Sequence, residues 1–136
     1  MSDLKATVAK FYTECLTVNN RSEPGAVMEQ LLASDFQSIG SVDAKTKAML
    51  IGQVRAFWKL IPDLKWEIQE MIAEGNKVVV RSIASGSPNG DFMGLPTNGS
   101  KSFKIMTIDI HTVTNGCVAS VHHLEDWATG MKQLKS

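Results

Sequence analysis

Cysteine is scarce in this sequence, and its scarcity limits how the fold can be stabilised. Only Cys15 and Cys117 occur among 136 residues, without the density of a secreted disulfide framework or the spacing of a zinc site. Reduced, buried thiols in a cytoplasmic protein are the interpretation that this pattern favours.

Net charge is also lacking, because fourteen basic residues balance fourteen acidic ones. A neutral chain is not typical of proteins that bind nucleic acid or anionic membranes, so we expect neither partner. Neutrality is instead compatible with self-association.

Long apolar runs are missing as well, so no membrane-spanning segment is expected. The first residues lack the basic segment and apolar core of a signal peptide. The hydrophobic content of 43% and charged content of 21% are ordinary for a globular protein. We therefore expect one domain over residues 1–136.

The spacing of the apolar residues divides the chain into a helical part and a strand-forming part. A helical period predicts helices over 4–16, 24–32 and about 47–61, with Ser22 as the cap of the second. A short strand is predicted over 36–39, and longer strands over 64–74, 77–87, 103–113 and 118–124. Helices first and a sheet afterwards are typical of the α+β class, here a curved, mostly antiparallel sheet wrapped around three N-terminal helices.

Gly75-Asn76 joins two of these strands, and a glycine in first place favours a type II′ turn. Counting from this turn places Glu70 opposite Arg81 and Ile68 opposite Ile83. Arg81 then either pairs with Glu70, which we favour, or holds an anion in a cavity.

Asn115-Gly116 is the strongest hairpin signal in the chain, because a type I′ turn needs positive φ at both central residues. A two-residue turn fixes the strand register by counting. The expected cross-strand pairs are His111 with Ser120, Asp109 with His122, Thr107 with Leu124, and Ile105 with Asp126.

One face of this hairpin would gather polar side chains, namely Thr107, Asp109, His111, Ser120, His122 and Asp126. The face is either solvated, as one side of an antiparallel sheet often is, or the wall of a pocket. His, Asp, Ser and Thr among apolar neighbours favour a pocket wall over the Lys- and Glu-rich pattern of a solvated face.

Residues 85–100 form a glycine- and proline-rich connection, and loops of this length are often functional. Its apolar residues Phe92, Met93 and Leu95 either cover a cavity or contact a second copy of the chain.

Several motifs resemble one family. They are Ile61-Pro62-Asp63-Leu64, Lys77-Val78-Val79-Val80-Arg81, Ala84-Ser85-Gly86, Phe92-Met93-Gly94-Leu95-Pro96-Thr97-Asn98-Gly99, Asn115-Gly116, and Asp126 followed by Gln133-Leu134. In this order they are similar to the SnoaL-like polyketide cyclase (ester cyclase) family over roughly residues 58–134. The chain departs from the family pattern at His122, often a tryptophan there, and at Thr97 and Lys135.

The resemblance implies the NTF2-like α+β cone and, commonly, a homodimer formed through the sheet. It implies no metal and no organic cofactor. It also implies that an aspartate near the end of the last strand is the general acid/base of an intramolecular aldol condensation. Asp126 matches that aspartate by its spacing to Gln133-Leu134.

An aldol closure needs one group that removes a proton from carbon and returns a proton to oxygen. Apolar neighbours such as Ile105 and Leu124 would raise the pKa of Asp126 for this task. Asp109 would fix the tautomer of His122, or the two would only form a cross-strand pair. We expect the ligand to contact His111, Ser120, Thr107, Leu124, Trp58, Phe92 and Leu95.

A metal site is the less favoured alternative for this wall. His122 and His123 are adjacent in a strand and so point to opposite faces, which prevents them from binding one ion together.

The sequence thus predicts a cofactor-independent enzyme, an ester cyclase, aldol-type or related isomerase or hydrolase. It would act on a small hydrophobic carbonyl compound. The alternative is a non-catalytic module that binds a small ligand or only dimerises.

Overall fold

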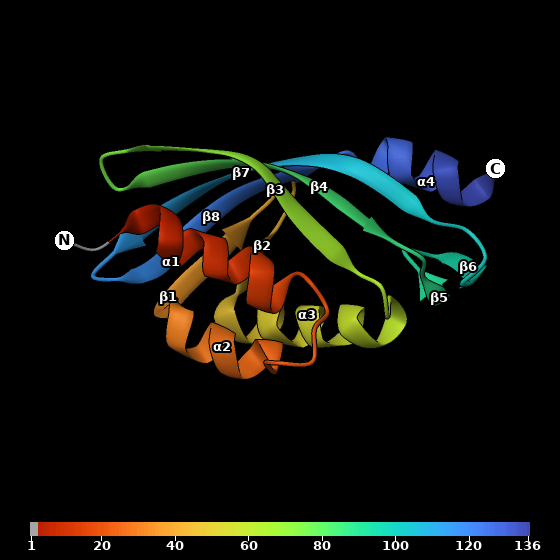
Figure 1. Ribbon diagram of the computed structural model, residues 1–136, viewed down its shortest axis with the longest axis horizontal. Coiled ribbons are helices and arrows are strands. Elements are labelled where there is room, and N and C mark those ends of the chain that lie inside the picture. The colour runs from red at the N-terminus through yellow and green to blue at the C-terminus, as the bar shows by residue number, and fades with distance from the viewer. Residues whose placement is uncertain (1–2) are drawn as a thin grey trace.

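The computed structural model describes residues 3–136 and confirms the α+β class. Helices α1, α2 and α3 lie against one side of a curved sheet, and the two ends of the chain lie at opposite ends of the molecule (Figure 1). The elements are α1 (Leu4–Lys10), a π-helical turn η1 (Phe11–Cys15), α2 (Pro24–Leu31), β1 (Leu32–Ile39), β2 (Ala44–Thr46), α3 (Lys47–Leu60), β3 (Lys65–Glu74), β4 (Lys77–Gly86), β5 (Asn89–Phe92), β6 (Leu95–Asn98), β7 (Phe103–Thr114), β8 (Cys117–Glu125) and α4 (Trp127–Lys135).

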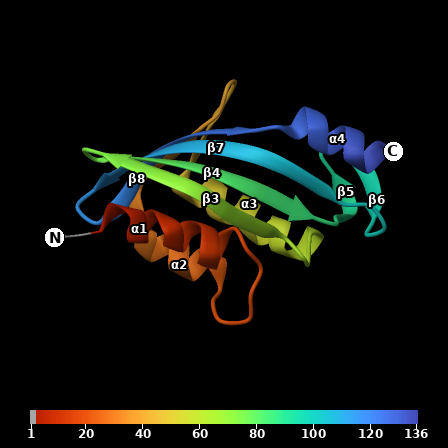
Figure 2. The same ribbon diagram turned by 45° about the horizontal axis from the view of Figure 1, so that its top comes forward.

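The main sheet has six strands in the order β2-β1-β8-β7-β4-β3. All neighbours are antiparallel except β1 and β8, which run parallel. Strands β4 and β7 alternate strictly between buried and more exposed residues, because successive side chains point to opposite faces of a sheet. One face of the sheet therefore packs on the helices, as Figure 2 also shows.

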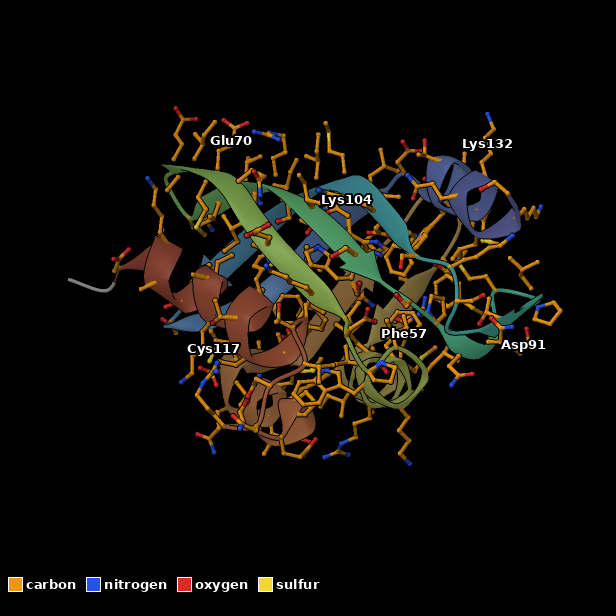
Figure 3. All side chains as sticks on the ribbon, turned by 45° about the vertical axis from the view of Figure 1, so that its right-hand side comes forward. Phe57, Glu70, Asp91, Lys104, Cys117 and Lys132 are labelled. Carbon is orange, nitrogen blue, oxygen red and sulfur yellow. The ribbon has the colours of Figure 1, made fainter. Side chains whose placement is uncertain are left out.

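The core lies between this inner face and the helices. Its largest fully buried side chains include Tyr12, Met28, Phe36, Phe92 and Phe103. Phe57 of α3 lies on this side, whereas Glu70 of β3 points away from the helices (Figure 3).

The second helix is capped by Glu23, not by Ser22 as expected. The Glu23 carboxylate accepts hydrogen bonds from the Gly25 and Ala26 amides at 2.8 and 3.0 Å, so it satisfies free donors of the first turn. The Ser22 hydroxyl instead donates to the Glu14 carbonyl oxygen at 3.2 Å.

The predicted pairing of Glu70 with Arg81 is confirmed, and the two side chains form an ion pair. The expected pair of Ile68 with Ile83 is wrong, because the register shifts between Ile68 and Glu70 and Ile68 faces Ser82. A bulge that leaves Gln69 without a cross-strand partner accounts for the shift.

The connection over residues 85–100, expected to be a turn-rich loop, contains a small hairpin of β5 and β6. Its turn has positive φ at Met93 (51°) and Gly94 (82°), as a type I′ turn requires. Phe92 is buried and stacks on Phe103 with a centroid distance of 5.7 Å, so the hairpin is anchored to the core.

Candidate active site

The hairpin of β7 and β8 begins as predicted and then changes register. Asn115 and Gly116 have φ of 53° and 78°, and Thr114 faces Cys117. Val113 pairs with Val118, but the next pair is Thr112 with Ser120, so Ala119 is an extra residue. This β-bulge moves every later residue of β8 by one position.

Because of the bulge, Asp109 faces His123, and the expected pairing of Asp109 with His122 is wrong. The pairs predicted for His111 and Thr107 are wrong for the same reason, since His111 faces Val121 and Thr107 faces Glu125. His122 and Leu124 lie on the outer face, where Leu124 is 63% exposed.

The inner face of the two strands therefore holds a different polar set from the one expected. Strand β7 contributes Thr107, Asp109 and His111, all buried, and β8 contributes the half-buried His123 and Glu125.

A cavity of about 260 Å³ opens between this wall and the helices. Most of its lining is apolar and aromatic, as is common for small-molecule sites. Its polar lining residues come from this wall and from β1, β2 and α3: Ser38, Lys45, Gln53, Asp109, His123 and Glu125. The Met93 side chain, at the tip of the small hairpin, also lines it.

Tyr12 reaches this wall from the π-helical turn η1 and is fully buried. Its hydroxyl donates a hydrogen bond to Asp109 Oδ2 at 2.6 Å and lies 2.7 Å from His111 Nε2. Single π-helical turns occur frequently at functional sites. Here the turn directs a tyrosine hydroxyl to two polar groups of β7.

Burial raises the pKa of Asp109 to about 7. The hydrogen bond from Tyr12 lowers this pKa, the charge of Glu125 raises it, and the charge of His123 and the backbone amide of Leu124 lower it again. A carboxyl group with a pKa near neutrality can both accept and donate a proton at physiological pH.

Burial also decides the protonation of the two neighbours of Asp109. It lowers the pKa of His111 to about 3, so this imidazole is neutral near pH 7. Burial and then the charge of Asp109 raise the pKa of Tyr12 well above its usual value, so the phenol keeps its proton.

His123 forms a second proton-handling pair on the same wall. Its Nδ1 lies 2.7 Å from Glu125 Oε2. The hydrogen bond to Glu125 raises the pKa of His123, although burial opposes this. The side chains of His123 and Glu125 are 26% and 16% exposed, so solvent only partly screens the pair.

Asp126 lies outside this cluster, at the start of α4. Its side chain accepts hydrogen bonds from the Thr129 amide and hydroxyl, which lower its pKa, and it is exposed. The expected apolar surroundings that would raise its pKa are therefore wrong. The spacing to Gln133-Leu134 instead reflects a helix cap, and Gln133 bonds the backbone of Lys104.

The other predicted ligand contacts are distributed over several environments. Thr107 accepts a hydrogen bond from Trp66 Nε1 at 3.0 Å, and Trp58 Nε1 donates to the Cys15 carbonyl oxygen at 2.8 Å. Ser120 is half-buried and pairs with Gln37 of β1. Leu95 packs against the core, as Trp58 does. Trp58 and Leu95 therefore stabilise the fold and are not among the residues that line the cavity.

Three residues of the wall were missed: Tyr12, His123 and Glu125. The sequence offered one signal, since His123 and Glu125 interrupt an otherwise apolar face of the predicted strand. Tyr12 offered none, because its spacing fits an apolar helical stripe.

Within residues 3–136 no three His, Cys, Asp or Glu side chains are grouped closely enough to hold a metal ion. None of the helices over the same range has the length and hydrophobicity needed to cross a membrane.

The protein is thus an α+β cone whose cavity is lined by the ionisable side chains of Asp109, His123 and Glu125. The family model of the SnoaL-like polyketide cyclases matches residues 6–134, and the chain belongs to this family. Membership supports a cyclase- or isomerase-type role that needs no cofactor. No curated protein matches the sequence.

Solved structures agree on the fold. A candidate SnoaL-like polyketide cyclase from Jannaschia sp. CCS1 has a TM-score of 0.85 at 20% identity, covering 98% of this chain and 92% of its own. IdmH, a candidate polyketide cyclase from Streptomyces antibioticus, has a TM-score of 0.82 at 19% identity, covering 99% and 100%. A protein with a ketosteroid isomerase-like fold from Catenulispora acidiphila DSM 44928 has a TM-score of 0.73 at 13% identity, covering 99% and 94%. The predicted NTF2-like cone is thus confirmed.

Proposed function

We propose that this protein is a cofactor-independent enzyme that uses Asp109 as a general acid/base on a small hydrophobic carbonyl compound. The reaction would be an aldol-type ring closure or a related isomerisation or hydrolysis. The observation that carries the proposal is a carboxyl group with a pKa of about 7 in the wall of a mostly apolar cavity.

Aldol chemistry explains why two proton-handling groups are useful on one wall. Asp109 as carboxylate would take a proton from the carbon beside a carbonyl group, which leaves an enolate. The enolate carbon would attack a second carbonyl carbon and form a C–C bond. The resulting alkoxide would take its proton from the His123 imidazolium or from the protonated Asp109.

The polar lining is placed to bind the oxygen atoms of such a compound. Gln53 lines the cavity from α3, Lys45 from β2 and Ser38 from β1. Aromatic and aliphatic side chains such as Phe57 and Val121 would bind the carbon skeleton. A cavity of about 260 Å³ suits a compound smaller than most drug-sized ligands.

Asp126, which the family resemblance favours as the acid/base, is less suited to that role. It is exposed, its carboxylate is engaged by Thr129, and its pKa is lowered. The geometry supports Asp109 instead.

The test is proton exchange, which needs only the first chemical step. Enolisable ketones and esters would be incubated with the protein in deuterated water, and deuterium at the acidic carbon followed by NMR. Asp109→Asn is expected to slow exchange by about 10²- to 10⁴-fold. Asp126→Asn, the matched control, is expected to stay within a few-fold of wild type. Exchange that survives Asp109→Asn would refute the proposal.

The same panel separates catalysis from simple binding. If a compound binds in the cavity but shows no catalysed exchange, the protein is a small-ligand-binding module of this fold.

A second copy of the chain is the partner that the outer face of the sheet favours. Met106, Ile108, Ile110 and Leu124 are 42–63% exposed on adjacent strands β7 and β8. Exposed apolar residues grouped in this way are typical of an interface. We therefore propose a homodimer formed through this face.

A further inference from the structure

Asp109, Tyr12 and His111 form a hydrogen-bonded chain whose direction the structure determines. Tyr12 Oη lies between Asp109 Oδ2 and His111 Nε2, at 2.6 and 2.7 Å. All three side chains are at most 5% exposed. Exchange of these bonds with solvent is therefore restricted.

Aromatic packing fixes the geometry of the chain. The rings of Tyr12 and His111 meet edge to face at 5.6 Å, and Phe11 contacts both rings edge to face at 5.7 and 6.0 Å. The His111 ring therefore has little freedom to turn over, and its Nε2 stays directed at Tyr12.

The number of available hydrogens allows only two arrangements. Tyr12 has one hydroxyl hydrogen, and the neutral His111 has one ring hydrogen. In the first arrangement Nε2–H donates to Tyr12, and Tyr12 donates to Asp109 Oδ2. In the second arrangement Asp109 carries a proton on Oδ2 and donates to Tyr12, Tyr12 donates to Nε2, and the ring hydrogen sits on Nδ1.

The second arrangement is disfavoured by the surroundings of His111 Nδ1. This atom is buried and has no hydrogen-bond partner among the described residues. An orphaned buried N–H is rarer and more costly than an acceptor that lacks a partner. The chain therefore runs in one direction, from Nε2–H through Tyr12 to Oδ2.

Asp109 lines the cavity, and its buried Oδ1, unlike Oδ2, forms no hydrogen bond to a described residue, although the backbone amide of Leu124 is close enough to lower the pKa of the carboxyl group. We propose that Tyr12 and His111 are positioning residues that occupy Oδ2 and leave Oδ1 as the single atom of Asp109 that exchanges protons. When a proton arrives, it binds Oδ1, and the chain behind Oδ2 is unchanged. That Oδ1 exchanges protons with a substrate rests on the proposed function.

Other ionisable groups also face Asp109 and contribute to its pKa. His123 and Glu125 face it from β8, with opposite effects on its pKa. Lys45 of β2 lines the cavity and lowers the pKa of His123. On β4 the cross-strand partner of Asp109 is the uncharged Val80. The backbone amide of Leu124 also lowers the pKa of Asp109, and a side-chain substitution does not remove it. Tyr12 and His111 are thus the side chains whose removal acts on Oδ2.

The first measurement is the tautomer of His111, read from ¹⁵N chemical shifts in the wild-type protein between pH 5 and pH 9. We expect the Nε2–H tautomer throughout, while the Asp109 carboxyl carbon titrates near pH 7. A change to the Nδ1–H tautomer with the same midpoint as Asp109 would overturn the proposal, because it would show that the hydrogen bonds from His111 through Tyr12 to Asp109 reverse their direction.

The second measurement compares the Asp109 titration midpoint in variants. His111→Gln keeps an amide N–H where Nε2 lies, and His111→Leu does not. We expect a midpoint within a few tenths of a pH unit of wild type for His111→Gln and a clear upward shift for His111→Leu. Tyr12→Phe removes the donor to Oδ2, and an upward shift of about one pH unit is expected.

Equal midpoints in His111→Gln and His111→Leu would overturn the role of His111. If Tyr12→Phe does not fold, the two His111 variants and the tautomer measurement still decide the question. None of these measurements needs a substrate. They therefore test the chain separately from Asp109→Asn, which tests the proposed function.

Discussion

Asp109 of β7 lies directly opposite His123 of β8, and both side chains line the cavity. A regular hairpin would have placed His122 there. The extra residue Ala119 thus decides which of two neighbouring histidines faces the interior.

The two histidines provide a matched pair of variants. His123→Asn keeps a donor near Glu125 but removes the imidazole, and we expect catalysed exchange or turnover to fall about 10²-fold. His122→Asn changes an exposed side chain and is expected to have no measurable effect. An equal loss in both variants, measured on the same substrate, would show that the register does not matter for function.

Asp126 is expected to contribute to stability through its capping bonds to Thr129. Asp126→Ala should lower the melting temperature by roughly a few degrees. Asp126→Asn keeps a capping oxygen and should lose less. Differential scanning calorimetry distinguishes the two variants, and identical melting temperatures would argue against the cap.

Asp109 and His111 should give the free energy of unfolding opposite dependences on pH. The pKa of Asp109 is about 7 in the folded state and about 3.9 in a free aspartate, so the folded state binds more protons between these values. Its contribution to stability therefore falls as pH rises from about 4 to about 7. The pKa of His111 is about 3 when folded and about 6.5 when free, so its contribution rises with pH between these values.

In the wild-type protein the two slopes oppose each other between about pH 4 and pH 6.5. Each slope is at most about 1.4 kcal/mol per pH unit. Asp109→Asn should expose the rising slope, and His111→Gln should expose the falling one. The raised pKa of His123 adds a falling contribution only above about pH 6.5, outside this window. Urea denaturation at pH 4.5, 5.5 and 6.5 measures both. Slopes of the same sign in the two variants would contradict the assigned pKa directions.

The proposed homodimer predicts that a charge at the centre of the outer face separates the two copies. Ile108 is 43% exposed between β4 and β8, so Ile108→Lys should shift the molecular mass measured by light scattering from dimer towards monomer. Val42→Lys is the control, because Val42 is 95% exposed in the connection between β1 and β2. A wild-type protein that is already monomeric at high concentration would exclude the dimer.

Local patterns in the sequence predict most of the elements of this fold. Turn chemistry identifies Asn115-Gly116, and the change of period at Leu64 separates helices from sheet. The ion pair of Glu70 and Arg81 also follows from local counting, because it lies between the turn and the bulge.

The candidate site was harder to predict because two of its features are not local. Ala119 has no side-chain chemistry that marks a bulge, so a register counted from the turn fails after Val118. Tyr12 and Asp109 are 97 positions apart, and a tyrosine in an apolar helical stripe does not indicate its hydrogen-bond partner. The sequence therefore identified the strand that carries Asp109 but assigned the wrong neighbours to it.

The sheet order has a consequence for how the protein folds. Strands β3, β4 and β7 are joined by sequential antiparallel contacts, whereas β1 has only the three-residue β2 beside it in the described sheet until β8 inserts. Contacts between distant parts of a chain form slowly, since they require closure of long loops. The wall of β7 and β8 comes from a local hairpin, but the cavity in front of it also needs Ser38, which β1 provides only after it pairs with the distant β8. A chain stalled before that step would have the wall but not the complete cavity.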